Sequence, residues 1–292
     1  MTLSKQLKDL RKINGMSQET LAEKLGVSRQ AVTKWETDGG MPDIDNLIRI
    51  SNLFGITVDQ LLSNEIENSN SKGYPYESKT EYDLDEVKHF DIKLGGLHTL
   101  YLIGTEGEKV KVGLGSNDIE TIQENFKVKI DDTKNRLDID IKRKHFITQA
   151  QAKECLVVTI EIPTQYLDDI EIETQCNQIY VNSIVCENME LKGKIKNVSI
   201  ENMQGKLELD CNLDMEISLD RFQGSFEINA ISSTSRLIVP SAFSFRSKIK
   251  GLSNSISYAC NKEKVEDFSD SGAENIIELN GFKSELVIEK KG

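Results

Sequence analysis

Pairs of apolar residues recur at an almost constant interval through residues 170–239. In each pair a single residue separates the two apolar ones, which is the alternation expected of a strand with one buried face. Successive pairs begin 9, 10, 9, 9, 10, 9 and 11 residues apart. The eight pairs are Ile170/Ile172, Ile179/Val181, Met189/Leu191, Val198/Ile200, Leu207/Leu209, Ile217/Leu219, Phe226/Ile228 and Leu237/Val239. Short strands at so even a spacing predict a repeat architecture in which these residues face inward.

Two architectures fit this spacing: a β-solenoid with two strands per turn, and an up-and-down antiparallel β-sandwich. Sandwich strands joined by tight hairpins favour Asn-Gly or Asp-Gly at their turns. Residues 170–239 contain neither dipeptide. This composition favours the solenoid, and the antiparallel sandwich stays open as the alternative.

Apolar and polar residues also alternate upstream, in VKVGL at 110–114, FKVKID at 126–131, RLDIDIK at 136–142 and LVVTIEI at 156–162. We therefore expect a β-rich domain over residues 81–292. Its segments NRLDID (135–140) and VTIEIPTQYLDDIEIET (158–174), followed by the strand ladder, resemble the "putative adhesin" family of bacterial β-solenoid domains. The resemblance implies a solenoid of a kind that is sometimes attached to a DNA-binding regulator.

The N-terminal part of the chain has a helical period instead. Residues Ser17–Glu36 read SQETLAEKLGVSRQAVTKWE. Ser17 and Ser28 are suited to cap two helices, and Gly26 between them can adopt the left-handed conformation that ends the first helix. Apolar residues fall on one face of each helix, at Leu21, Ala22, Leu25, Ala31, Val32 and Trp35. This spacing predicts a helix-turn-helix.

The segments LKDLRKINGMSQETLAEKLGVSRQAVTKWE (7–36) and PDIDNLIRISNLFGITVDQLL (42–62) resemble the Xre family, the phage Cro and repressor type. The resemblance implies a five-helix DNA-binding domain over residues 1–62. We expect the first helix at Thr2–Asn14, the fourth to end at Phe54 and the last to begin at Thr57. The expected core residues are Leu7, Leu10, Leu21, Leu25, Val32, Trp35, Leu47 and Phe54, with Ile44 and Ile48 also turned inward on the fourth helix.

Helix three, Ser28–Glu36, leaves a polar face directed away from this core. Arginine can read guanine O6 and N7 in the major groove and glutamine can read adenine N6 and N7. Side chains one turn further along can reach a base edge or a phosphate. The family motif also implies that the residue at the start of helix two contacts the phosphate backbone and supports helix three. The expected DNA-binding residues are Gln18, Ser28, Arg29, Gln30, Thr33 and Lys34.

The distribution of charge agrees with this assignment, although the formal net charge of the chain is −12. Residues 1–35 hold seven Lys and Arg against three acids, whereas residues 36–66 hold one Arg against six acids. Positive charge is therefore concentrated on the segment that contains helix three. Phosphate affinity depends on such local neutralisation of charge.

Residues 63–80, SNEIENSNSKGYPYESKT, show no period and have the polar composition of a linker. The N-terminal segment lacks the apolar run of a signal peptide, and no stretch approaches the ~18 apolar residues of a membrane span. The five cysteines are widely spaced, which is typical of reduced thiols rather than of disulfides or a zinc site. We expect a cytoplasmic bacterial protein with no membrane contact.

Motifs of catalysis are missing from the sequence. The chain contains no HExxH, GxSxG or P-loop motif, and its histidines, His89, His98 and His145, are scattered. The carboxylates of the predicted strands alternate outward, as on a solvated face. We therefore expect no enzymatic activity, no catalytic residues, no metal site and no cofactor.

The sequence as a whole predicts a sequence-specific DNA-binding transcriptional regulator that resembles the Cro and phage-repressor type, with activation and repression both left open. Its helix three would read a double-stranded operator as part of a homodimer. The β-rich domain would sense an unknown effector or protein partner, oligomerise, or do both. The alternative is a protein-interaction module, antitoxin-like or a scaffold, in which the helical domain binds a partner protein. The polar face of helix three disfavours that alternative, because a protein-binding helix would carry an apolar stripe there.

Overall fold

The computed structural model describes residues 3, 4, 7, 8, 11, 16–37, 39–54, 74–144 and 146–291. The chain divides into two compact units, Met1–Lys72 and Gly73–Gly292. No helix in the described part of the chain combines the length and the apolar character needed to cross a lipid bilayer.

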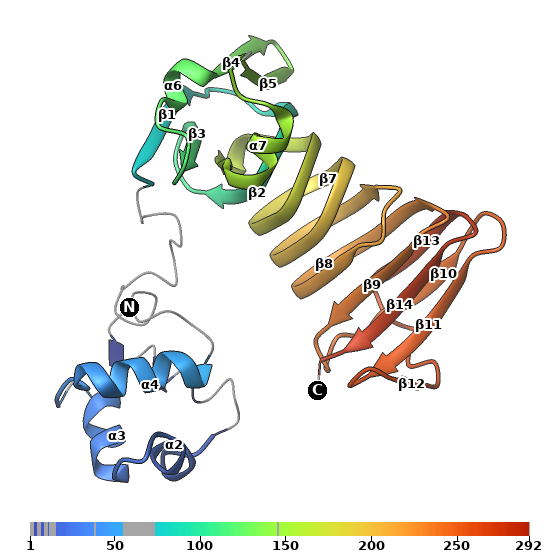
Figure 1. The fold of residues 1–292 in the computed structure, drawn as a ribbon. Helices are drawn as coiled ribbons and strands as arrows, with labels where there is room; N and C mark the ends of the chain where they lie inside the picture. The colour runs from blue at the N-terminus through green and yellow to red at the C-terminus, as the bar shows by residue number, and fades with distance from the viewer. Residues whose placement is uncertain are drawn as a thin grey trace. The chain divides into compact units, whose positions relative to one another are not determined.

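Three complete helices are described in the N-terminal unit: α2 (Gln18–Leu25), α3 (Arg29–Glu36) and α4 (Ile44–Phe54) (Figure 1). Five residues of the expected first helix are also helical, namely Leu3, Ser4, Leu7, Lys8 and Arg11. The last expected helix, from Thr57 to Leu62, lies outside the described residues.

The core of the N-terminal unit is formed by apolar side chains from the first helical segment and from α2, α3 and α4. The predictions for Leu7, Leu21, Leu25, Val32, Trp35 and Leu47 are confirmed, because all six are at most 7% exposed. Phe54 packs against this core while partly buried. Leu10 lies outside the described residues.

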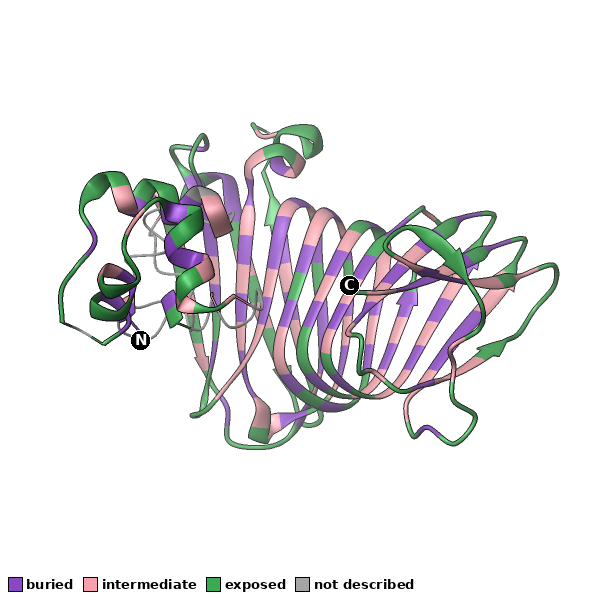
Figure 2. Cartoon of the chain, turned by 90° about the horizontal axis from the view of Figure 1, so that it is seen from below, coloured by how far each residue is buried: buried purple, intermediate pink, exposed green. Residues whose placement is uncertain are grey.

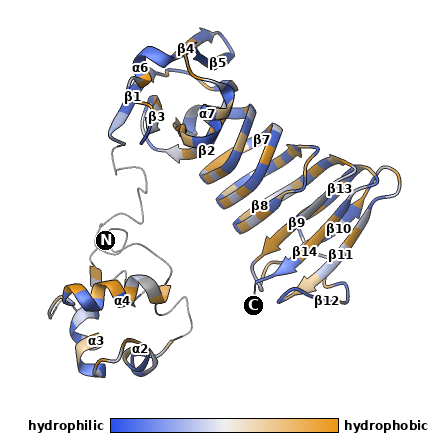
Figure 3. Cartoon of the chain, in the orientation of Figure 1, coloured by the Kyte–Doolittle hydropathy of each residue, from blue (hydrophilic) through white to orange (hydrophobic). Residues whose placement is uncertain are grey.

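The prediction that Ile44 and Ile48 face the core is wrong. Their exposed fractions are 74% and 44%, whereas Leu47 and Ile50 on the same helix are 6% and 0% exposed. Consecutive helical residues are turned by about 100°, so the face fixed by Leu47 and Ile50 leaves Ile48 beside it and Ile44 projecting from the first turn. Hydrophobic residues recur along α4 (Figure 3), and only some of them are covered.

The C-terminal unit is built on a 14-stranded sheet. Its strands are β1 (Tyr76–Asp83), β2 (Lys88–Thr105), β3 (Lys109–Ser116), β4 (Phe126–Thr133), β5 (Arg136–Arg143), β6 (Val157–Pro163), β7 (Leu167–Asp210), β8 (Glu216–Ile231), β9 (Thr234–Val239), β10 (Arg246–Ile249), β11 (Ser255–Cys260), β12 (Glu263–Val265), β13 (Ile276–Phe282) and β14 (Glu285–Lys290). The short helices α6 (Ile122–Asn125) and α7 (Gln149–Cys155) and the 3-10 turn η1 (Thr164–Tyr166) interrupt them.

Neighbouring strands from β7 onward are mostly parallel. Val198 of β7 pairs with Ile217 of β8, and Leu207 pairs with Phe226, so the partners are 19 residues apart. The sixteen residues of the eight apolar pairs are all at most 2% exposed, which confirms that they face inward. Figure 2 shows the result as alternating stripes of buried and less buried residues across the stacked strands.

The first part of this unit is mixed: β2 pairs in parallel with β5, β6 and β7, and the other pairs are antiparallel. β3 pairs with β1 on one side and with β6 on the other, and β4 and β5 form a hairpin pair. β1 begins at Tyr76, so residues 76–80, which we expected at the end of the linker, lie in a strand. Its sequence YESKTEYD has no apolar alternation. Backbone pairing with β3 places β1 in the sheet. This pairing cannot be recognised from the composition of β1.

Glycines allow neighbouring backbone segments of the sheet to stack closely. Gly205 and Gly224 have φ angles of 133° and 137°, which side-chain-bearing L-residues rarely adopt. A Cβ on Gly224 would lie 2.0 Å from the carbonyl oxygen of Gly205. A Cβ on Gly205 would lie 2.0 Å from the carbonyl oxygen of Cys186. The spacing of these backbone segments at Gly205 and Gly224 therefore depends on residues without a side chain.

Candidate nucleic-acid interface

Helix α2 is bounded by a serine at its start and a glycine at its end. The Ser17 hydroxyl accepts a hydrogen bond from the backbone N–H of Thr20 at 3.0 Å, which satisfies an unpaired donor at the start of α2. Gly26 adopts the left-handed conformation, with φ 69° and ψ 33°, and its N–H bonds back to the last turn of α2. The chain leaves α2 in a direction that allows α3 to begin at Arg29.

Helix α3 presents a continuous polar surface. Ser28 caps it, because its hydroxyl accepts from the backbone N–H of Ala31 at 3.2 Å. Val32 and Trp35 are buried, which fixes the rotation of the helix about its axis. Ser28, Arg29, Gln30, Thr33 and Lys34 are all exposed. Five of the six expected DNA-binding residues therefore lie on one solvent-facing surface at the turn and along α3.

Gln18 is half-buried and joins α2 to α3. Its amide nitrogen donates to the carboxylate of Glu36 at 2.8 Å. Its amide oxygen lies 3.2 Å from the hydroxyl of Thr33. The single proton of that hydroxyl is shared between this oxygen and the backbone carbonyl oxygen of Arg29, 2.9 Å away. The side chain of Gln18 thus contacts both the exposed face of α3 and the buried end of that helix.

Arg11 and Glu36 form a buried ion pair in this unit. The guanidinium donates two hydrogen bonds to the carboxylate, at 2.5 Å and 2.9 Å. The side chains are only 11% and 1% exposed. Burial opposes ionisation of Glu36, but hydrogen bonds from Arg11 and Gln18 outweigh it and lower the pKa of the Glu36 carboxyl. The hydrogen bond to Glu36 raises the pKa of Arg11.

Sequence reasoning missed the Arg11–Glu36 pair. A weak signal was available, because Glu36 is the last residue of α3 and a carboxylate is unfavourable at the negative end of a helix dipole. An acid in that position suggests a cationic partner. The partner lies 25 residues away in the sequence, so its identity could not be read from spacing.

Arg29 remains available to a ligand. Its contact with Glu19 is 3.4 Å long, and the two side chains are 63% and 64% exposed. Surface pairs of this kind are typically worth under about 1 kcal/mol, so a phosphate or a base edge can replace Glu19 as the partner of Arg29. The surface as a whole offers a guanidinium, an ammonium, an amide and two hydroxyl groups on an eight-residue helix and its cap.

Residues 7–61 match the helix-turn-helix family model. These residues form a helix-turn-helix domain. The match includes α2, α3 and α4 and bears out the resemblance to Xre-type regulators drawn from the sequence.

Curated relatives of the helix-turn-helix domain are regulators of transcription. They include the transcriptional activator BcrR of Enterococcus faecalis, 45% identical over 65 residues, which are 22% of this chain and 32% of that protein. The regulator ImmR of Bacillus subtilis is 37% identical over 65 residues, 22% of this chain and 51% of that protein. The phage repressor RstR of Vibrio cholerae is 30% identical over 61 residues, 21% of this chain and 54% of that protein.

The similarity to these relatives extends over 61 to 65 residues, about a fifth of this chain. The chain spans about a third of the length of BcrR and about half that of ImmR and RstR. One of the three is named an activator and another a repressor, so the domain occurs with both outcomes.

Solved structures similar to the strand-rich unit include two bacterial proteins, one described as a cell adhesion protein and the other as an adhesin. A "putative cell adhesion protein" from Clostridium sporogenes has a TM-score of 0.38 and 11% identity, covering 74% of this chain and 99% of that chain. A "putative adhesin" from Bacteroides fragilis has a TM-score of 0.34 and 10% identity, covering 73% of this chain and 96% of that chain.

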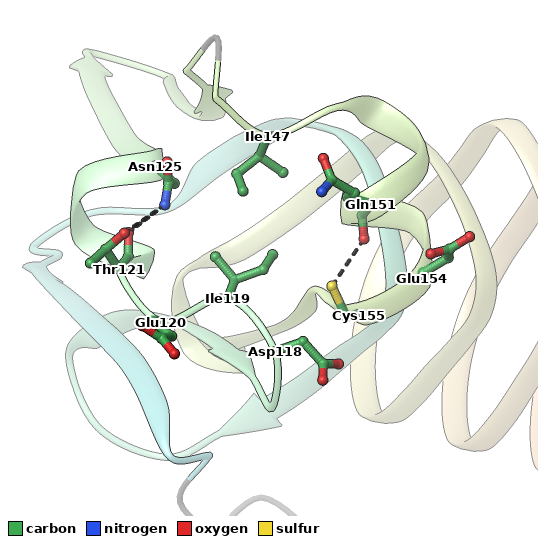
Figure 4. A pocket seen from close by; sticks show the side chains of 9 residues that line it. All are labelled: Asp118, Ile119, Glu120, Thr121, Asn125, Ile147, Gln151, Glu154 and Cys155. Carbon is green, nitrogen blue, oxygen red and sulfur yellow. Dashed lines mark hydrogen bonds between the residues drawn. The ribbon is translucent and has the colours of Figure 1, made fainter.

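The strand-rich unit contains a pocket of about 460 Å³ between the loop that follows β3 and the helices α6 and α7 (Figure 4). Its lining combines carboxylates, amides, a thiol and two isoleucines: Asp118, Ile119, Glu120, Thr121, Asn125, Ile147, Gln151, Glu154 and Cys155. The thiol of Cys155 donates to the carbonyl oxygen of Gln151 at 3.0 Å, and burial raises its pKa. The thiol is thus kept protonated, and all five cysteines of the chain are free.

Three acids of the strand-rich unit, Asp168, Asp169 and Glu187, bring their carboxylates within 4.8 Å of one another. Asp169 accepts hydrogen bonds from the backbone and the side-chain amide of Asn188, both at 2.9 Å. These bonds join two segments of β7 that are 19 residues apart in the sequence and account for the position of Asp169 without an ion.

Proposed function

We propose that this protein is a sequence-specific DNA-binding transcriptional regulator and that α3 enters the major groove of its operator. The observation that carries the proposal is the exposed face of Arg29, Gln30, Thr33 and Lys34 on a helix whose opposite face is fixed in the core. The regulatory function of the relatives of this domain supports it. So does the polar character of the face, since a helix that docks on a partner protein would expose apolar residues there.

The residues of this face have different tasks in the proposal. Arg29 and Gln30, at the N-terminal end of α3, read base edges, because their planar end groups can make two parallel hydrogen bonds to guanine or adenine. Ser28 and Lys34 bind phosphates and position the helix. Thr33 contacts a base or a thymine methyl. Gln18 reaches the backbone of DNA while it holds Thr33 and Glu36.

We further propose that the strand-rich unit is a β-solenoid with two strands per turn. The parallel pairing of β7 with β8 and of β8 with β9 supports this architecture, since Val198 pairs with Ile217 and Ile217 with Leu237. Strands of a hairpin sandwich would be antiparallel to their neighbours. In the regulator this unit senses an effector or a protein partner, or joins two copies, within the cytoplasm.

The direct test is selection of DNA sites from a random pool by the full chain, followed by mobility-shift titration of the selected site. Arg29→Ala relaxes the preference at one base position, and Lys34→Ala weakens all sequences alike. Affinity falls steeply between low and moderate salt, because phosphate contacts release counterions. If the double variant Arg29→Ala/Gln30→Ala binds the selected site as tightly and as selectively as the unmodified chain, the protein does not read DNA with α3 in this way.

The matched control for Arg29 lies in the strand-rich unit. Arg221 is also 63% exposed and also pairs with an exposed acid, Glu201. Its φ angle is 52°, so Asn is the suitable replacement. Arg221→Asn removes the same charge from the chain and leaves site selection unchanged if the interface is α3.

A further inference from the structure

Helix α4 carries an apolar stripe that nothing in the described structure covers. Met41, Ile44 and Ile48 are 66%, 74% and 44% exposed. Ile44 and Ile48 are one helical turn apart on the same side of α4, and the exposed Met41 lies three residues before Ile44, ahead of the helix. None of the three belongs to the exposed face of α3, so a partner on this stripe leaves the proposed DNA-reading residues free.

Charged residues border the stripe on one flank. Asp45 and Arg49 are four residues apart on α4, and both are exposed. One guanidinium nitrogen of Arg49 donates to the carbonyl oxygen of Leu25 at 3.2 Å. Arginine has five N–H donors, so Arg49 retains donors for a second acceptor. The flank therefore presents a negative group and a positive group one turn apart.

We propose that the stripe of Met41, Ile44 and Ile48 binds the same stripe of a second copy of this chain, with the two α4 helices antiparallel. Across a two-fold axis each patch meets itself, and the same flank of each antiparallel helix lies opposite the other. Ile44 of one copy then packs on Ile48 of the other. Asp45 and Arg49 of one copy face Arg49 and Asp45 of the other, which is an arrangement of opposite charges.

The charge pattern indicates that the partner on this stripe is a second copy of this chain. The flank is complementary to itself in the antiparallel arrangement, which an unrelated partner would not require. The inference also rests on the proposed function, since an operator with two half-sites about 34 Å apart needs two helix-turn-helix domains held together. Contact through α4 joins these domains directly, whatever the strand-rich units do.

The first experiment measures the oligomeric state of the full chain by sedimentation equilibrium. Ile44→Glu/Ile48→Glu places charges in the stripe and is expected to weaken dimerisation about tenfold or more. Because both residues are exposed, the unfolding temperature should match that of the unmodified protein at concentrations low enough for both to be monomeric. Val87→Glu is the control, since Val87 is 54% exposed in the strand-rich unit. A double variant that dimerises like the unmodified chain overturns the proposal, and so does an unmodified chain that is monomeric at every concentration.

The second experiment exchanges the charges. In the Asp45→Arg variant, residue 45 of one copy and Arg49 of the other are both positive. In the Arg49→Asp variant, residue 49 of one copy and Asp45 of the other are both negative. Each variant therefore dimerises weakly by itself. Mixed together, the two variants restore both opposite-charge contacts and form a heterodimer. A mixture that associates no better than its components overturns the proposal.

DNA binding separates failure of this inference from failure of the proposed function. Binding of a single half-site by the Ile44→Glu/Ile48→Glu variant, with loss of cooperative binding to the complete operator, supports both. A chain that dimerises through α4 but selects no DNA sequence refutes the proposed function and leaves the interface standing. Cooperative binding of the complete operator by the double variant overturns the α4 interface and leaves the DNA-binding function standing.

Discussion

The guanidinium of Arg11 holds the carboxylate of Glu36 in two hydrogen bonds, Nε to Oε1 at 2.5 Å and Nη2 to Oε2 at 2.9 Å, across 25 residues of sequence. Gln18 donates a third hydrogen bond to the same carboxylate. Three parts of the domain therefore meet at Glu36: the first helical segment, the start of α2 and the end of α3. The position of the exposed face of α3 depends on this buried polar contact.

Removal of Arg11 should destabilise the N-terminal unit strongly. Arg11→Ala leaves the buried carboxylate of Glu36 with only its bond from Gln18, and a broken buried ion pair costs about 3 kcal/mol or more. The fluorescence of Trp35 reports this unit selectively, because Trp35 is the one tryptophan of the chain and is 7% exposed. We expect urea unfolding followed by Trp35 to shift to lower denaturant concentration.

Glu19→Gln is the control for that experiment. It removes an acid from an exposed ion pair with Arg29, and changes of this kind are usually within about 0.5 kcal/mol. Equal shifts for Arg11→Ala and Glu19→Gln would contradict the view that the buried pair holds the domain together.

The stability of the N-terminal unit should depend on pH through Glu36. Its pKa is lower in the folded protein than the ordinary value of about 4.3, because the hydrogen bonds and charges of its neighbours outweigh its burial. The unfolded chain therefore binds a proton first as pH falls, so the contribution of Glu36 is present above about pH 4.3 and is lost as pH falls toward its folded pKa. Unfolding monitored by Trp35 at a series of acidic pH values measures this loss. Glu36→Gln should have a shallower slope in the same range, and an unchanged slope would assign the effect to other acids.

The predictions from the sequence succeeded where the signal is local. Ser17, Gly26 and Ser28 cap and separate two helices as their side chains dictate, and the strict alternation of the apolar pairs identified the buried face of the strands. These features depend on neighbours within a few residues. They do not require knowledge of which distant segment packs against them.

Predictions failed, or were not possible, where distant segments meet. Ile44 and Ile48 fit the helical period of a buried stripe. They are exposed because the covered face of α4 is too narrow to include them. The pairing of β1 with β3 and the bonds from Arg11 and Gln18 to Glu36 join residues far apart in the sequence. Polar composition in β1 and an acid at a helix end gave no unique partner for either.

The stacked glycines provide a test of the strand-rich unit. Gly224→Ala forces a φ of 137° on a residue with a side chain and places its Cβ 2.0 Å from the carbonyl oxygen of Gly205. The strained backbone alone costs about 1–3 kcal/mol, and the close contact adds to it. We expect a clear fall in the thermal unfolding temperature followed by the circular dichroism of the sheet.

Gly113→Ala is the matched control, because a Cβ there would meet its nearest atom, Thr159 Cβ, at an ordinary 3.7 Å. Its unfolding temperature should stay close to that of the unmodified protein. If Gly224→Ala were equally harmless, the backbone segments that contain Gly205 and Gly224 would have to be free to move apart.

The substitution Gln18→Glu should turn the attraction between residue 18 and Glu36 into repulsion. In Gln18→Glu the amide nitrogen that donates to Glu36 at 2.8 Å becomes a carboxylate oxygen, while the oxygen that accepts from Thr33 is retained. Two carboxylates at hydrogen-bond distance cannot both ionise without repulsion, so the pair should take up a proton at a higher pH than either acid alone. We expect the variant to be less stable than the unmodified chain at pH 7 and to gain stability as pH is lowered toward about 5, opposite in sign to the loss that Glu36 causes in the unmodified chain. Trp35-monitored unfolding at both pH values checks the sign.

Affinity for the selected operator should change in the same direction as stability if Gln18 positions α3. Gln18→Ala, which removes both bonds without adding a charge, should lower stability and affinity with no such pH dependence, and a pH response shared by both variants would refute a direct interaction between residue 18 and Glu36.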